Sequence, residues 1–135
     1  AMEQKISEKF GPVALAVARD ALEPKLDRWG GYRPWQACKQ EYLGQLAIAE
    51  PRALDICVAD EIHACGSTSA SLRRLGLEYL RTVSRAGSEQ TVWWYRSMLE
   101  IVSARSDWPR RAMLGELRVM SADLVRSLRE NEEGL

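Results

Sequence analysis

The chain has 135 residues, and its 19 Lys and Arg residues balance 19 Asp and Glu residues, so its formal net charge at pH 7 is zero. This length predicts a single domain, residues 1–135, that buries a hydrophobic core without disulfide bonds. The charge balance excludes a strong overall field that would steer nucleic acid or membranes to the protein. The longest apolar run, residues 13–18, is far shorter than the roughly 20 residues that span a bilayer, and we expect a soluble, cytoplasmic protein. Ala1 before Met2 is typical of a cloning remnant.

The first half of the chain carries helical periodicity. Apolar residues recur at three- and four-residue spacing from Leu15 to Leu26 and predict a helix that ends at residues 29–31, with Pro24 kinking or dividing it. A second helix is predicted over residues 34–49. Pro51 suits a first helical turn and is expected to open a third helix over residues 51–65. A fourth is predicted over residues 69–86.

The second half carries the same period. Gly87 and Ser88 form a helix stop followed by an N-cap and predict a fifth helix over residues 89–105. Ser106 or Asp107 is expected to cap a long sixth helix that runs to about residue 131, with residues 132–135 as a frayed tail. No useful stretch alternates at period two. The sequence therefore predicts an all-α, single-domain bundle of five to six helices.

Residues 55–74 combine two cysteines, acidic residues and the only histidine, which raises the question of a metal site. On one helix His63 projects about 180° away from Leu54, and Cys57 and Cys65 lie about 12 Å apart along the axis, too far to share one ion. The alternatives pair Asp60 with His63, or Glu61 with a cysteine, and need ligands from other helices. We expect no metal and no cofactor. The three cysteines, with Cys38, are expected to be reduced core thiols.

Glu61 falls within the apolar arc of its helix. A buried carboxylate needs a cationic or hydrogen-bonding partner, and such groups concentrate at functional sites. Structural ion pairs are commoner than catalytic acids. We therefore expect Glu61 at the rim of the bundle, paired with an arginine, and keep a catalytic acid as the alternative.

The segment "GSTSASLRRL", residues 66–75, resembles the turn and recognition helix of bacterial helix-turn-helix repressors. The resemblance covers about twenty residues and implies a nucleic-acid-binding regulator. The residues that would face DNA in this register are Thr68, Ser69, Arg73 and Arg74. Arg81 and Arg85 extend the arginine face along the fourth helix and suit phosphate contacts. Nucleic acid is therefore the alternative partner.

Trp93 lies on the polar side of the fifth helix with Arg96 and Glu100, and a tryptophan among charges is a candidate interface anchor. On the sixth helix, acidic and basic rows flank the apolar stripe, as in helix pairing. We favour a non-enzymatic module for self-association or protein interaction, in which the chain binds itself as a homodimer or higher oligomer, or binds another protein.

Catalytic signatures are missing from the sequence. It contains no glycine-rich phosphate loop, nucleophile elbow or paired catalytic carboxylates, and we expect no enzyme. The third hypothesis is a small-molecule pocket between helices. The aromatic residues that would line it are Trp35, Tyr42, Trp94, Tyr95 and Trp108.

Overall fold

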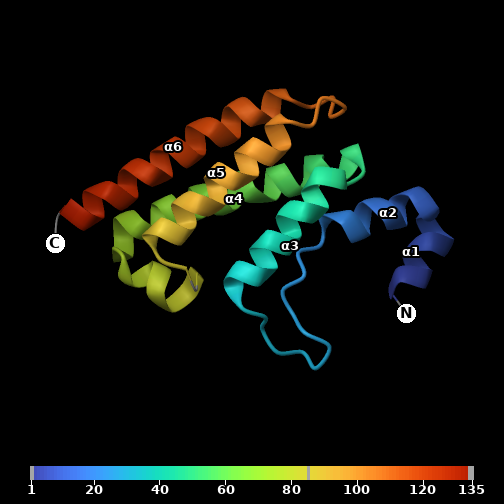
Figure 1. The fold of residues 1–135 in the computed structure, drawn as a ribbon, viewed down its shortest axis with the longest axis horizontal. Coiled ribbons are helices and arrows are strands. Elements are labelled where there is room, and N and C mark those ends of the chain that lie inside the picture. Colours follow the sequence, from blue (N-terminus) through green and yellow to red (C-terminus); the bar gives the residue numbers. More distant parts are fainter. Residues whose placement is uncertain (1, 85, 134–135) are drawn as a thin grey trace.

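The structure is a computed structural model that describes residues 2–84 and 86–133, and every regular element in these ranges is helical (Figure 1). An isolated bridge between Leu26 and Tyr32 is the one extended pairing that the described residues make. The all-α prediction is confirmed. The elements are α1 (Met2–Phe10), α2 (Pro12–Ala21), α3 (Trp35–Ile48), α4 (Pro51–Leu75), the short π-helix η1 (Leu80–Ser84), α5 (Ser88–Ser103) and α6 (Ala112–Glu133).

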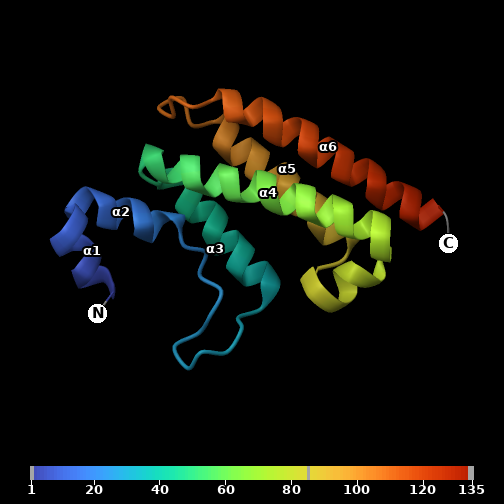
Figure 2. The same cartoon turned by 180° about the vertical axis from the view of Figure 1, so that it is seen from behind.

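The bundle is built around α4 and α6, which lie side by side in both views (Figures 1 and 2). Helix α5 packs against α6 and also contacts α3. Helices α1 and α2 pack against each other at the end of the molecule opposite the C-terminus, where α2 contacts α4. The protein thus has a packed body of four helices with an N-terminal arm.

The hydrophobic core lies among α3, α4, α5 and α6. It draws residues at three- and four-residue spacing from each of these helices, as amphipathic helices require. The fully buried side chains include Leu46, Leu54, Val58, Leu72, Met98, Val102, Trp108, Leu117, Leu124 and Leu128. No described residue of α1 or α2 is fully buried.

The predicted turn at residues 66–68 is wrong, because α4 runs unbroken to Leu75. Glu61, Cys65, Ser69 and Leu72 are all buried on one face, so the packed stripe continues through Gly66. The helix stops at Gly76 instead. There a φ of +71° suits glycine, and the Gly76 N–H bonds to the Leu72 carbonyl at 2.9 Å.

The N-terminal helix is shorter than predicted. Gly11, with a φ of +91°, separates α1 from α2, and α2 ends at Ala21. Pro24 disfavours helix in the residue before it, and the chain is already extended at Leu22. Leu22 and Leu26, which belong to the apolar period of the predicted helix, are 68 % and 54 % exposed.

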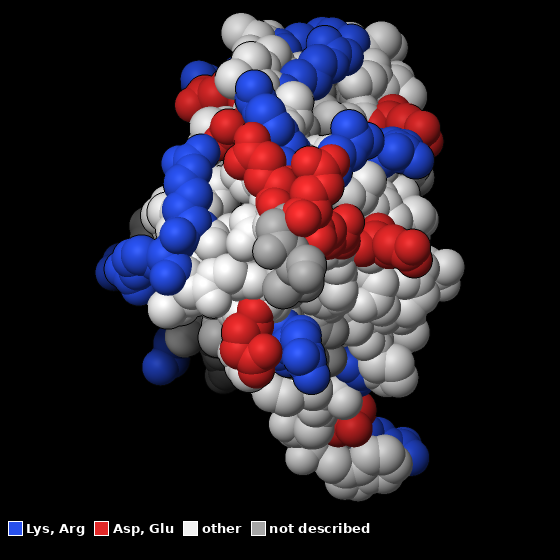
Figure 3. All heavy atoms as spheres, turned by 90° about the vertical axis from the view of Figure 1, so that its left-hand side faces the viewer, with Lys and Arg blue, Asp and Glu red and all other residues white. Residues whose placement is uncertain are grey.

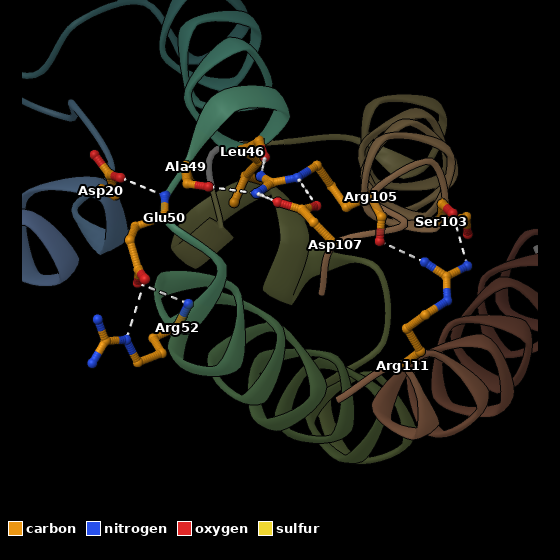
Figure 4. Close-up of polar contacts among 9 residues, drawn as sticks. All are labelled: Asp20, Leu46, Ala49, Glu50, Arg52, Ser103, Arg105, Asp107 and Arg111. Atoms are coloured by element: carbon orange, nitrogen blue, oxygen red, sulfur yellow. Dashed lines mark hydrogen bonds and ion pairs between the residues drawn. The ribbon is translucent and has the colours of Figure 1, made fainter. Parts of the chain in front are cut away.

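Arg105, in the connection from α5 to α6, closes the end of α3 (Figure 4). Its Nη1 and Nη2 groups donate to the carbonyls of Leu46 and Ala49 at 2.7 and 2.6 Å. The Asp107 carboxylate holds the same guanidinium at 2.9 and 3.0 Å. The last carbonyls of a helix have no partner within it, and two of those at the end of α3 are bonded by an arginine 56 or more residues along the chain.

The start of α6 also differs from the prediction. Asp107 binds Arg105 instead of capping a helix, and α6 begins only at Ala112. Arg111 fixes the intervening turns by donating to the carbonyls of Arg105 and Ser103 at 2.6 and 2.9 Å (Figure 4). At the other end, Glu132 and Glu133 belong to α6, so the frayed tail predicted from residue 132 begins too early; residues 134–135 lie outside the described ranges.

Candidate functional site

A groove runs between α5 and α6 on the surface of the packed body. It consists of two adjoining hollows of about 300 and 560 Å³. Four residues line both hollows, namely Val92, Arg96, Val125 and Arg129. We call the combined surface the α5–α6 groove. Its two walls belong to helices that pack against each other, so the side chains that line it are carried on a rigid support.

The floor of the groove is apolar. It is formed by side chains that the helical period brings to the edge of the core, including Val92 and Leu99 of α5 and Ala122 and Val125 of α6. Deeper in the groove lie the buried Tyr95 and Leu128. These residues are partly or fully buried in the bundle, except for the exposed Ala122, and the groove gives solvent access to an otherwise apolar seam.

The rim of the larger hollow carries four arginines, Arg96, Arg118, Arg126 and Arg129, and no acidic residue lines that hollow. Arg118 donates to Ser103 Oγ at 3.2 Å, and Arg126 lies 3.4 Å from Asp123. Arg96 and Arg129 make no hydrogen bond or ion pair with another described residue. Guanidinium groups stay charged at any physiological pH. The larger hollow therefore presents positive charge above an apolar floor, whereas Glu89 and Glu132 line the smaller one.

Trp93, Arg96 and Glu100 were predicted to form one interface. Trp93 and Arg96 both line the smaller hollow, whereas Glu100 is exposed and lies outside the groove. Trp93 is half-buried, with its ring edge-to-face against Trp35 at 6.0 Å between centroids. Part of its apolar surface is thus already covered within the chain.

The residues predicted to face nucleic acid do not share one helix face. Thr68 and the buried Ser69 lie within the last third of α4, and the Ser69 Oγ atom has no hydrogen-bond partner among the described residues. Because α4 ends at Leu75, Arg81 belongs to η1, beyond Gly76. The single arginine stripe predicted on a fourth helix is therefore wrong.

The arginines of that stripe have different surroundings. Arg73 forms an ion pair with Asp123 of α6 at 2.8 Å, and Arg81 lies 3.5 Å from Glu78. Arg74 is exposed, and Arg85 lies outside the described residues. On the end of the molecule formed by the end of α6 and the segment after α4, a band of acidic side chains runs between basic ones (Figure 3). Charges of both signs are thus mixed on this face.

The cysteines are buried thiols. Burial raises the pKa of Cys65 to about 12 and also raises the pKa of Cys57, so neither is a ready thiolate. Among residues 2–84 and 86–133, no three His, Cys, Asp or Glu side chains lie close enough together to hold a metal ion. His63 is exposed on α4.

Glu61 has a different environment from the one predicted. It is buried, with 7 % exposure, and its Oε2 atom accepts a hydrogen bond from Trp94 Nε1 at 3.2 Å. Its expected place at the rim beside an arginine is therefore wrong. Burial raises the pKa of this carboxyl, while the Lys39 ammonium and the Trp94 hydrogen bond oppose that rise.

The sequence did not reveal the α5–α6 groove as such. The basic row on the sixth helix, which includes Arg118 and Arg129, was visible in the sequence, but it was not connected to Arg126 or to the apolar floor. The usable signal was the alternation on one face of α6, where Ala122 and Val125 fall between Arg118 and Arg129 at three- and four-residue steps.

Comparison with known proteins finds no matching family and no significantly similar curated protein. No helix in the described parts of the chain has the length and apolar character needed to cross a membrane.

Proposed function

We propose that the protein is a helical interaction module that binds an acidic amphipathic helix of another protein in the α5–α6 groove. The observation that carries the proposal is the combination of an apolar floor with a rim of four arginines and no acidic residue in the larger hollow. A surface of this kind complements a ligand that is apolar on one side and negative on its flanks.

A helix suits this surface better than an extended peptide. The groove follows two packed helices and offers no sheet edge for main-chain pairing. An amphipathic helix places apolar side chains at positions i, i+3, i+4 and i+7, which can enter the hollows in a row. Acidic residues on its shoulders would then meet Arg96 on one wall and Arg126 and Arg129 on the other.

A second copy of the chain suits the groove less well. In a two-fold dimer the same patch faces itself, which would bring the four arginines of one copy toward the four of the other. Such like charges oppose association unless acidic residues intervene. Self-association through Trp93, Arg96 and Glu100 therefore stays a prediction, to be checked by sedimentation at micromolar concentration.

Nucleic acid has weaker support. An apolar floor contributes nothing to phosphate binding, which depends on positive charge. The chain has no net positive charge, and the arginines predicted for this role are separated or paired with acids.

The proposal is tested with a labelled acidic amphipathic peptide of about 18 residues, about five helical turns. Fluorescence anisotropy should show saturable binding that weakens as salt is added, because screening acts on the exposed arginines. Arg129→Glu should weaken binding by about tenfold or more, a loss of about 1.4 kcal/mol.

Arg74→Glu is the matched control. Arg74 is also an exposed helical arginine without a described partner, but it does not line the groove. Binding by this variant should equal that of the wild type. Equal losses in the two variants, or binding no tighter than that of a scrambled peptide of the same composition, would refute the proposed function.

A further inference from the structure

A second cavity, separate in chemistry from the groove, opens to solvent between the packed body and the segment that follows α2. It has a volume of about 190 Å³, which corresponds to about six water molecules in the liquid. Its lining combines charged groups with aromatic walls. The residues that matter for its chemistry are Glu23, Lys39, Asp60, Glu61, Trp35 and Trp94.

Glu61 is the unusual member of this lining. Its only described hydrogen bond comes from the neutral indole of Trp94, and it forms no ion pair with a described residue. The nearby Lys39 ammonium pairs with Glu23 instead, at 2.7 Å, and Lys25 lies 3.6 Å from the same carboxylate. The Oε1 atom of Glu61 thus accepts no hydrogen bond from the described residues. This oxygen keeps contact with solvent in the lining of the cavity, where a bound N–H donor would replace water.

The walls of the cavity already interact with a cation. The Lys39 ammonium lies 4.4 Å from the centroid of the Trp94 ring and 5.9 Å from that of Trp35. Three carboxyl groups, those of Glu23, Asp60 and Glu61, face the ammonium groups of Lys25 and Lys39 across the lining. With all of them ionised, one negative charge is left over, and indole faces stabilise a positive charge brought next to them.

We propose that this cavity binds a short primary amine, whose ammonium group donates a hydrogen bond to Glu61 Oε1. The unpaired oxygen calls for an N–H donor, which a primary ammonium has and a quaternary ammonium lacks. Asp60 and Thr68 also line the cavity and offer further acceptors. Leu80, Ala86 and Tyr95 provide an apolar wall for a short hydrocarbon chain. The site does not depend on the proposed role of the α5–α6 groove.

Titration calorimetry of the full chain with n-butylamine tests this site. At a pH of about 8 the amine is protonated, because alkylamines titrate near 10.4, and the carboxyl is more fully ionised than at neutral pH. We expect saturable one-to-one binding with a Kd of about 1 mM or lower. Tetramethylammonium and butyrate at the same concentrations should bind at least about tenfold more weakly.

Two variants and a control locate the binding. Glu61→Gln should weaken butylamine binding by about tenfold or more, because the amide carries no charge. Glu100→Gln, at an exposed glutamate of α5 outside the cavity, should bind like the wild type. Ala64→Leu fills the cavity while keeping Glu61, and it should also abolish binding, which preserves the test if Glu61→Gln does not fold.

Absence of saturable butylamine binding by the wild type, undiminished binding by either cavity variant, or equal affinity for tetramethylammonium would overturn the proposal. Binding of the acidic peptide by Ala64→Leu provides a separate readout of the groove, so that failure of one site is distinguishable from failure of the other.

Discussion

Residues 2–34 and residues 35–133 both contain helices with apolar side chains at helical spacing, but among the described residues only the second region builds a core. In the packed body, side chains such as Leu46 and Leu117 are fully buried. In the N-terminal arm, none of the helical residues is fully buried, and Phe10, Leu22 and Trp29 are more than half exposed. Periodicity therefore predicts which face of a helix is apolar, whereas burial depends on whether another element covers that face.

The arm is attached by the partly buried Val17 and Ala21, which pack against the core, and by polar contacts. Asp20 accepts a hydrogen bond from the Glu50 N–H at 2.7 Å, at the start of α4. Gln45 of α3 donates to the Leu22 carbonyl at 2.9 Å. Hydrogen bonds close to solvent contribute less than a buried apolar interface, so we expect the arm to open locally more readily than the body.

The largest expected effect comes from a leucine truncation in each region. Leu117→Ala should lower the free energy of unfolding by about 2–5 kcal/mol, because it removes buried methyl groups and leaves a cavity in the body. Leu22→Ala, at a side chain that is 68 % exposed, should change it by less than about 0.5 kcal/mol. Urea denaturation followed by circular dichroism measures both. A loss at Leu22 as large as that at Leu117 would erase the contrast between the regions.

Two arginines of the α5–α6 connection provide the next comparison. Arg105→Gln should destabilise the body by about 1–3 kcal/mol, because the Leu46 and Ala49 carbonyls lose their donors. Arg110→Gln removes an exposed ion pair with Asp55 and should cost at most about 1 kcal/mol. The same urea experiment applies. Equal costs would mean that Arg105 does not close α3.

Glu61 makes the stability of the body depend on pH. Burial raises the pKa of its carboxyl in the folded chain, whereas in the unfolded chain it titrates near 4.3. The folded state therefore binds this proton more tightly, and the wild type loses stability as pH rises from that value through the raised pKa. In Glu61→Gln the side-chain amide does not titrate, so this pH dependence is absent.

The variant should therefore be more stable than the wild type at neutral pH, by about 1–3 kcal/mol, with the difference vanishing below about pH 4. Thermal melts of the wild type and Glu61→Gln at several pH values between about 4 and 7 measure this difference in stability. If the wild type instead gains stability relative to Glu61→Gln as pH rises, the ionised carboxylate is stabilised by its surroundings, and this prediction is wrong.

The smallest expected effect lies in the arm. Arg19 and Glu3 form a two-point contact at 3.1 and 3.0 Å between α2 and α1, and both side chains are more than half exposed. The contact lowers the pKa of Glu3. Arg19→Gln should leave the midpoint of global unfolding unchanged and speed hydrogen exchange only in α1 and α2. Faster exchange in α4 or α6 would show that the arm supports the body.

The sequence was sufficient to predict helices whose ends are marked by local residues such as proline. Residues 34–49 were predicted as a helix and form α3 as Trp35–Ile48, because Pro34 and Pro51 bound it. It was insufficient at Gly66, where a glycine within a packed stripe was read as a turn. The sequence analysis missed the groove because its walls come from two helices. It also missed the surroundings of Glu61, because the nearby Lys39 pairs with Glu23 and not with Glu61.

The arm also exposes aromatic side chains, among them Phe10 and Trp29, so the position of peptide binding is the decisive question. Titration of 15N-labelled protein with the acidic amphipathic peptide, followed by amide chemical shifts, answers it directly. The proposed function predicts that the largest shifts fall on residues 92–99 of α5 and residues 118–129 of α6. Shifts concentrated in residues 2–34, with α5 and α6 unchanged, would contradict it.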